Sequence, residues 1–231
     1  MNRILSILVG ATIMTTASLA EEGFRNRPIT NNLSMPTGYT LHANEFTVGL
    51  GTVNYGIAEN FQAGTNVLLF LFQIYNANVK YSFYKKSTGA VAAGLDFARF
   101  DLPAWDKDTQ ITFTSISPFL AYSRSIGNKT TLHASGQYSF YSSDADIEDA
   151  KAEAQTTGTS FSLGLENNLS VRTKYLVEGG YDLTFKGLRA GGGFLWGWEK
   201  FRLKVGVAYF KPEKLDGFTF PYIGLWWRFK A

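Results

Sequence analysis

The sequence predicts an all-β fold, a closed antiparallel up-and-down transmembrane β-barrel of about twelve strands, with ten as the alternative count. Three observations predict it. Short runs of alternating apolar and polar residues follow one another from about residue 45 to the end of the 231-residue chain. No apolar stretch after the leader reaches the roughly 18 residues that a spanning helix needs. Aromatic residues make up 16% of the chain and 23 residues are glycine, which suits aromatic belts at two interfaces and glycine in curved strands.

The first twenty residues have the pattern of an export signal. Arg3 supplies the positive start, a mostly apolar run follows from Ile4 to Ile13, and Ser18-Leu19-Ala20 offers the small residues of a cleavage site. The residues after it are polar, and we expect a periplasmic arm or a partial plug. The expected division is therefore a signal peptide over residues 1–20, the N-terminal arm over 21–36 and the barrel over 37–231.

The clearest strand runs from Tyr75 to Phe83. Its two faces differ throughout: Tyr75, Ala77, Val79, Tyr81 and Phe83 against Asn76, Asn78, Lys80 and Ser82. Similar alternation recurs near residues 131–140, 160–166, 174–185 and 201–209. In a soluble sandwich the apolar face would be mainly aliphatic, whereas here aromatic residues recur at strand ends, where lipid headgroups would lie.

Some segments fit the pattern less well. Val67 to Phe72 is apolar on both faces, and Ile111 to Tyr122 requires a phase change, which predicts a bulge near Pro118. Eleven strand-like runs follow Glu45. Because both ends of the barrel should be periplasmic, the strand number must be even, and we expect Thr37 to His42 to supply the twelfth strand.

Turn length alternates along the chain, which is typical of barrels with short periplasmic turns and longer external loops. Short turns are expected at residues 58–60, 86–89, 127–129, 167–168 and 199–200, and longer connections at 103–110, 144–158 and 211–217. The longest, Asp144 to Gly158, is rich in Asp and Glu, and we interpret it as a solvated acidic loop because it lacks the spacing of a calcium loop.

Composition excludes several classes of function. The chain has no cysteine, so it has no disulfide, no thiol nucleophile and no cysteine for an N-terminal lipid anchor. The net charge of +3 is small and the basic residues are dispersed, so no nucleic-acid partner is expected. The two histidines, His42 and His133, lie far apart in the sequence and do not support a metal site. No nucleotide fingerprint is present, and Gly191-Gly192-Gly193 is interpreted as allowing curvature or close packing. We expect no cofactor.

The C-terminal segment FTFPYIGLWWRF, residues 218–229, is the most specific signal. Ile223, Leu225, Trp227 and Phe229 alternate toward one face. This segment resembles the terminal strand of Gram-negative outer-membrane β-barrel proteins, although Lys230-Ala231 follow the final aromatic residue. The resemblance is to the class and not to a particular family. It implies location in the bacterial outer membrane, contact with outer-membrane lipid, and recognition of the last strand by the barrel-assembly machinery.

The polar strand faces should line the lumen. The candidate lumen-lining residues are Lys80, Asp96, Glu166, Lys174, Glu178, Asp182, Arg189, Arg202, Lys204 and Arg228. They would form either compensating ion pairs that fill the barrel or the wall of a narrow, water-filled channel. The width of the lumen decides between the two. The main hypothesis is accordingly a non-enzymatic barrel that acts as a small passive pore for small solutes or as a structural envelope protein.

Two alternatives remain open at this point. His133 and Ser135 lie two residues apart on one strand face, and outer-membrane phospholipases and lipid A deacylases carry a similar His-x-Ser element, although the asparagine common after that serine is missing here. This pattern predicts a lipid hydrolase as the first alternative. A soluble, secreted β-barrel or sandwich that binds a ligand is the second.

Overall fold

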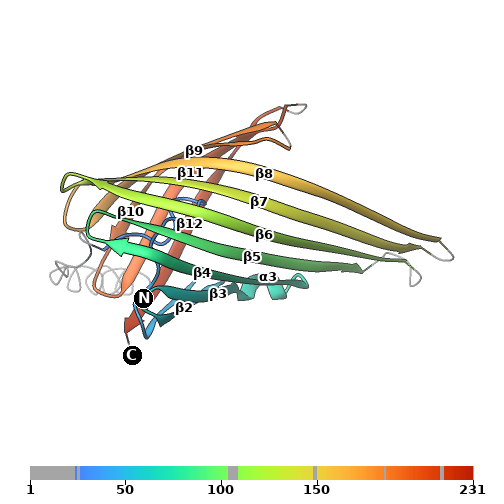
Figure 1. Cartoon of the computed structure of the whole chain (residues 1–231), viewed down its shortest axis with the longest axis horizontal. Helices are drawn as coiled ribbons and strands as arrows, with labels where there is room; N and C mark the ends of the chain where they lie inside the picture. Colours follow the sequence, from blue (N-terminus) through green and yellow to red (C-terminus); the bar gives the residue numbers. More distant parts are fainter. Residues whose placement is uncertain are drawn as a thin grey trace, which may run out of the picture.

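The computed structural model is a closed barrel of twelve antiparallel strands, as the sequence predicts (Figure 1). The structure describes residue 24 and residues 27–103, 109–147, 150–184, 186–213 and 216–230, and the expected signal peptide lies outside them. The strands are β1 (Glu45–Gly49), β2 (Thr52–Ala58), β3 (Phe61–Asn66), β4 (Ile74–Lys86), β5 (Gly89–Pro103), β6 (Thr109–Ile126), β7 (Thr130–Ile147), β8 (Ala150–Asn168), β9 (Thr173–Asp182), β10 (Gly187–Gly197), β11 (Phe201–Lys211) and β12 (Phe218–Lys230), with one short helix, α3 (Val67–Phe70), between β3 and β4.

Each strand pairs with its neighbour in the sequence, and β1 closes the barrel against β12 through the pairs Glu45↔Lys230 to Gly49↔Trp226. The start of β1, the end of β12 and five short connections lie at one end, which we call the turn end. The opposite end, which carries the 103–109 and 147–150 connections, is the loop end. Closure matters because an open edge would leave backbone N–H and C=O groups without partners in hydrocarbon.

The outer surface is apolar over a band around the barrel. Tyr75, Val79, Tyr81 and Phe83 of β4 are exposed, and so are Ile223, Trp227 and Phe229 of β12, whereas Lys80, Ser82, Arg202 and Lys204 point inward and are buried. This inverts the pattern of a soluble protein and is what a wall in contact with hydrocarbon requires. Within the described residues, no helix has the length and apolar character needed to span a bilayer.

Four strands are much longer than the strands at the start of the barrel. Strands β5 to β8 have 15, 18, 18 and 19 residues, against 5, 7 and 6 for β1 to β3. A membrane crossing needs about 9–11 residues, so β5–β8 project beyond the loop end as a sheet, visible in Figure 1. The outer face turns polar there, where Arg99 Nε and Thr112 Oγ1 donate to Asp101 at 3.4 and 2.8 Å.

Three local predictions are wrong. Thr37 to His42 is not a strand; this segment lies inside the barrel, and β1 begins only at Glu45. Residues 144–158 are not a long loop, since pairs from Tyr138↔Thr159 to Ile147↔Ala150 continue the β7–β8 ladder. Between β5 and β6 the register stays constant past Leu95↔Pro118, so the described part of β6 has no bulge at this position.

Helix α3 replaces the strand-like run that is apolar on both faces. The Asn66 side chain caps it by accepting a hydrogen bond from Leu68 N at 3.2 Å, and Val67 N donates to Gly51 O at 2.6 Å. An asparagine at this position satisfies an amide that a starting helix would otherwise leave without a partner. Alternation alone could not distinguish the two structures, because a short apolar run has no period.

A charge on the apolar band should destabilise the barrel. Leu163 points outward in mid-band and its side chain is 69% exposed. We expect Leu163→Arg to lower the free energy of unfolding by about 2–4 kcal/mol, because the guanidinium must enter hydrocarbon. Chemical denaturation in phospholipid bilayers measures this. Gln155→Arg, on the same face of β8 but in the projecting sheet, is the control and should change stability by less than about 0.5 kcal/mol. Equal losses in both variants would contradict a lipid-facing band.

Candidate functional site

The lumen is occupied at the turn end by the chain's own N-terminal segment. Residues 27–42, which we call the plug, run inside the barrel before β1 begins. The sequence predicts a periplasmic arm or a partial plug over residues 21–36, and the described part of that segment lies inside the barrel. Thr37, Tyr39 and Leu41 are buried, and the plug closes on itself through Asn32 N to Met35 O and Thr37 N to Thr30 O, at 3.0 and 3.1 Å.

Charged side chains of the wall hold the plug by its backbone. Lys80 Nζ donates to Thr30 O at 2.7 Å, and Lys174 Nζ donates to Arg27 O at 2.6 Å. Lys204 Nζ donates to the carbonyl oxygens of Asn31, at 3.3 Å, and Asn32. Buried ammonium groups need such partners, because an unpaired charge inside a protein is strongly unfavourable.

One carboxylate forms the opposite kind of contact. Glu178 of β9 accepts hydrogen bonds from Ser34 N at 2.9 Å, Met35 N at 3.0 Å and the Ser34 hydroxyl. Polar groups complete the attachment, since Ser123 Oγ accepts from Gly38 N at 2.9 Å and Gln62 Oε1 accepts from Leu41 N at 2.9 Å. The plug is therefore fixed by both signs of charge and by neutral groups.

Glycines make room for the plug. A Cβ on Gly56 would lie 1.9 Å from His42 O, one on Gly164 would lie 2.4 Å from Asn32 Nδ2, and one on Gly191 would lie 2.9 Å from Leu33 Cδ1. Gly56 therefore has no room for a side chain while the plug is in place, because its neighbour is a backbone oxygen, whereas at Gly164 and Gly191 a plug side chain would have to shift. The close-packing interpretation of Gly191 agrees with this contact.

The ten predicted lumen-lining residues all lie at inward positions of their strands, but they do not form one group. Six are buried around the plug: Lys80, Glu166, Lys174, Glu178, Arg202 and Lys204. Asp96 and Arg228 are half-buried and border a cavity beside the plug. Arg189 bonds Ser162 Oγ at 2.7 Å, and Asp182 accepts from Thr184 N near the loop end. Cross-strand ion pairing is seen for Lys174 and Glu166, whose Nζ and Oε1 lie 2.5 Å apart.

Histidine 133 does not hydrogen-bond Ser135. Its Nδ1 lies 2.8 Å from Ser123 Oγ, and its Nε2 lies 3.5 Å from Glu166 Oε2. The contacts Ser123–His133–Glu166 bring together the three residue types of a hydrolytic triad. However, Ser123 is fully buried and its hydroxyl also accepts from Gly38 N, so no substrate carbonyl has access to it. The arrangement secures the plug, and the His133–Ser135 pair has no geometry for hydrolysis.

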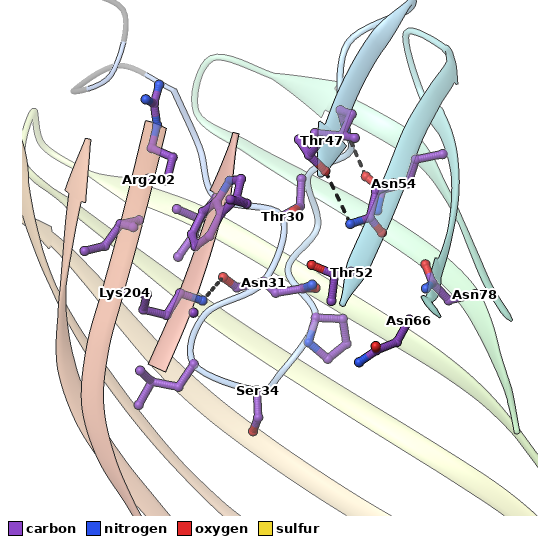
Figure 2. Close-up of a pocket in the computed structure, with 18 of the residues that line it drawn as sticks. Thr30, Asn31, Ser34, Thr47, Thr52, Asn54, Asn66, Asn78, Arg202 and Lys204 are labelled. Atoms are coloured by element: carbon purple, nitrogen blue, oxygen red, sulfur yellow. Dashed lines mark hydrogen bonds between the residues drawn. The ribbon is translucent and has the colours of Figure 1, made fainter. Parts of the chain in front are cut away.

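A cavity of about 490 Å³ with a mixed lining, polar on its β1–β4 side, remains between the plug and the wall (Figure 2). Amide and hydroxyl side chains of β1 to β4 line one side: Thr47, Thr52, Asn54, Gln62, Thr65, Asn66, Asn76 and Asn78. The plug contributes Thr30, Asn31 and Ser34, and the far wall contributes Tyr222, Trp226 and Lys204. The volume falls in the range of about 300–1,000 Å³ that is typical of small-molecule sites.

The neutral residues of this cavity are not among the predicted lumen-lining residues, all of which are charged. A signal was available, because Asn76, Asn78 and Lys80 occupy the polar positions of the clearest predicted strand. The plug contacts had no comparable signal. Backbone oxygens of residues 30–32 are the acceptors, and backbone groups carry no residue-specific information.

Comparisons with known proteins find similar solved structures but no matching family. No family model and no curated protein match it. Among solved structures it is similar to Ail, the attachment invasion locus protein of Yersinia pestis, at 12% identity over 81% of this chain and 99% of that chain, with a TM-score of 0.33. It is similar to the KdgM porin in complex with disordered oligogalacturonate at 10% identity, over 80% of this chain and 96% of that one, with a TM-score of 0.42. It is similar to the TodX deltaS2S3 mutant monoaromatic hydrocarbon channel at 9% identity, over 80% of this chain and 76% of that one, with a TM-score of 0.42.

Removal of the Glu178 carboxylate, which holds the plug, should make the plug more accessible to solvent. We expect Glu178→Ala to raise the thiol-labelling rate of a Met35→Cys reporter at least about tenfold, because three donors of Ser34 and Met35 lose a charged acceptor. The chain has no other cysteine, so maleimide labelling reports this position alone. Glu153→Ala, the same change on the projecting sheet, is the matched control. Equal labelling rates in both variants would show that Glu178 does not hold the plug.

The buried Lys174–Glu166 pair should be costly to break from one side. We expect Lys174→Met to lower the free energy of unfolding by about 3–5 kcal/mol, because Glu166 would remain buried without its cation. The double variant Lys174→Met/Glu166→Leu should recover most of that loss. Denaturation of the folded barrel in detergent micelles measures both, and additive losses would argue against the pairing.

Proposed function

We propose that the protein is an integral barrel of the bacterial outer membrane that passes small polar solutes through a lumen closed by its own N-terminal plug. The apolar outer band and the exposed Ile223, Trp227 and Phe229 of the last strand support a location in outer-membrane lipid. The same strand, with its aromatic residue near the end, is the segment that the barrel-assembly machinery would recognise.

The observation that carries the proposal is the cavity of about 490 Å³ beside the plug, whose β1–β4 side is polar. A barrel with a purely structural role gains stability by filling its lumen, since close packing is favourable. Here the wall of β1 to β4 presents hydroxyl and amide groups to open space, although apolar side chains there could close it. This favours a conducting role over the structural envelope role.

The plug makes the proposed pore a gated one, whereas the sequence predicted a small passive pore. Its hydrogen bonds to the wall can exchange with water when the plug shifts, while Ile29 and Leu33 also pack in an apolar cluster with Leu176 and Leu195 of the wall. At Lys80, Lys204 and Glu178 the bonds go to backbone groups of the plug, so a shift at these points exchanges hydrogen bonds and leaves the strands intact. Movement of the plug therefore offers a route past it without unfolding of the wall.

Plug movement should control conductance in planar bilayers. We expect wild-type protein to show a low conductance with brief openings, and Glu178→Ala to be open for a larger share of the time. A Met35→Cys/Gly164→Cys variant should stay closed when oxidised and open again after reduction, since a Cβ at Gly164 would lie 2.9 Å from Met35 Sδ. Silence of all three proteins at every voltage, in samples that are folded and inserted, would leave the structural role as the better account.

A further inference from the structure

The lumen wall is divided into an ionic half and a neutral half. Buried ionic side chains lie mainly on β8, β9 and β11, namely Glu166, Lys174, Glu178, Arg202 and Lys204. Of these, Lys174, Glu178 and Lys204 bond the plug, as Lys80 of β4 and Glu45 of β1 also do. The side chains that face the cavity from β1 to β4 are mostly amides and hydroxyls. From this division we infer, on the basis of the proposed channel function, that the cavity binds an uncharged polyhydroxylated solute of the size of a mono- or disaccharide.

The amide groups suit a polyol because each one both donates and accepts. Neighbouring hydroxyl groups of a sugar do the same, so an amide can bond two of them at once. In the part of the chain that the structure describes, the side chains of Asn31 and Asn78 have no protein partner. Figure 2 shows Asn31 extending from the plug toward Thr52 and Asn54 of the opposite wall, so a solute between them would meet polar groups on both sides.

The cations that border the cavity are already engaged. Lys80 and Lys204 donate to plug carbonyls, Arg27 and Arg228 pair with Glu45, and Arg202 donates to Phe201 O at 2.9 Å. An anionic solute would have to break these contacts before it gained any of its own. A wholly apolar solute would bury the amide groups without a partner, which costs free energy for each one. A neutral polar solute avoids both costs.

Aromatic rings supply the second surface that a sugar needs. Tyr222 and Trp226 border the cavity, with Lys204 Nζ 5.4 and 5.6 Å from their ring centroids. Toward the loop end, Phe100, Phe113 and Tyr141 form a row on the inner face of β5 to β7, with successive centroids 5.2 and 5.9 Å apart. The C–H face of a pyranose ring packs on such rings, while its hydroxyl groups point to the edges and reach polar neighbours.

Binding of sugars to the purified barrel tests this directly. Titrations in detergent micelles, followed by intrinsic tryptophan fluorescence, would use glucose and maltose against glucuronate, glucosamine and benzyl alcohol as anionic, cationic and apolar probes. We expect saturable binding of a neutral sugar at least about tenfold tighter than of any of the other three. Asn78→Leu and Asn31→Leu should each weaken it about tenfold without loss of folding, because neither side chain bonds the protein.

Controls separate the outcomes. Gln155→Leu makes the same change of residue type on the projecting sheet and should leave sugar binding unchanged. Equal affinity for neutral and charged probes, tighter binding of benzyl alcohol, or no effect of Asn78→Leu would overturn the inference. Binding is measured without transport, so the two experiments fail independently. If sugars do not bind but the bilayer experiment shows conductance, the channel proposal stands. If no conductance is seen, the binding titration still tests the sugar site.

Discussion

Burial of charge inside a closed wall is the constraint on which the rest of the structure depends. Hydrocarbon covers the outer face, so polar side chains must point into the lumen, and there they cannot all be solvated. Lys80, Lys174, Lys204 and Glu178 are satisfied by backbone groups of the plug, and only Lys174 also has a carboxylate within hydrogen-bond distance. The plug is therefore a structural partner of the wall as well as an obstruction in the lumen. Its position follows from the distribution of buried charge.

Differences in strand length determine where the lumen is accessible. Strands β1 to β3 are short, so the wall is low on the side that holds the polar cavity, while β5 to β8 rise as a sheet on the other side. Turn chemistry sets these lengths locally. Gly51 adopts a φ of +84° in the tight turn that ends β1 after five residues, and the Asn66 cap ends β3 by starting a helix. The projecting sheet then continues the inner face of the barrel outward with its row of aromatic rings.

The strands of the barrel wall could be predicted from the sequence, whereas the plug inside the barrel and its contacts could not. Alternation predicted the twelve-stranded closed fold and the outward face of residues 75–83, because a lipid-facing strand must repeat every second residue. It failed where that constraint ends. Above the membrane both faces of residues 144–158 can be polar, so a strand there looks like a loop. Inside the lumen the plug has no period at all, and Thr37 to His42 alternated by chance. The ten charged positions could be predicted as inward-facing, whereas their partners could not, because those partners are largely backbone carbonyls and amides.

The division of the lumen wall explains how a plugged barrel can also hold a solute site. If charges surrounded the plug on all sides, any movement would leave several of them unpaired at once, and the plug would be fixed. Here most ionic contacts come from one side, and amides and hydroxyls, which water can satisfy, face the other. The plug can therefore separate from the β1–β4 wall at small cost while it keeps its contacts to Glu178, Lys174 and Lys204. A solute that passes would move along the neutral side, so gating would need a local shift of residues 30–34 and not expulsion of the whole segment. Two charged groups interrupt the neutral side: Lys80, whose bond to Thr30 O such a shift must break, and Glu45 of β1, which pairs with Arg27 of the plug at 3.3 Å.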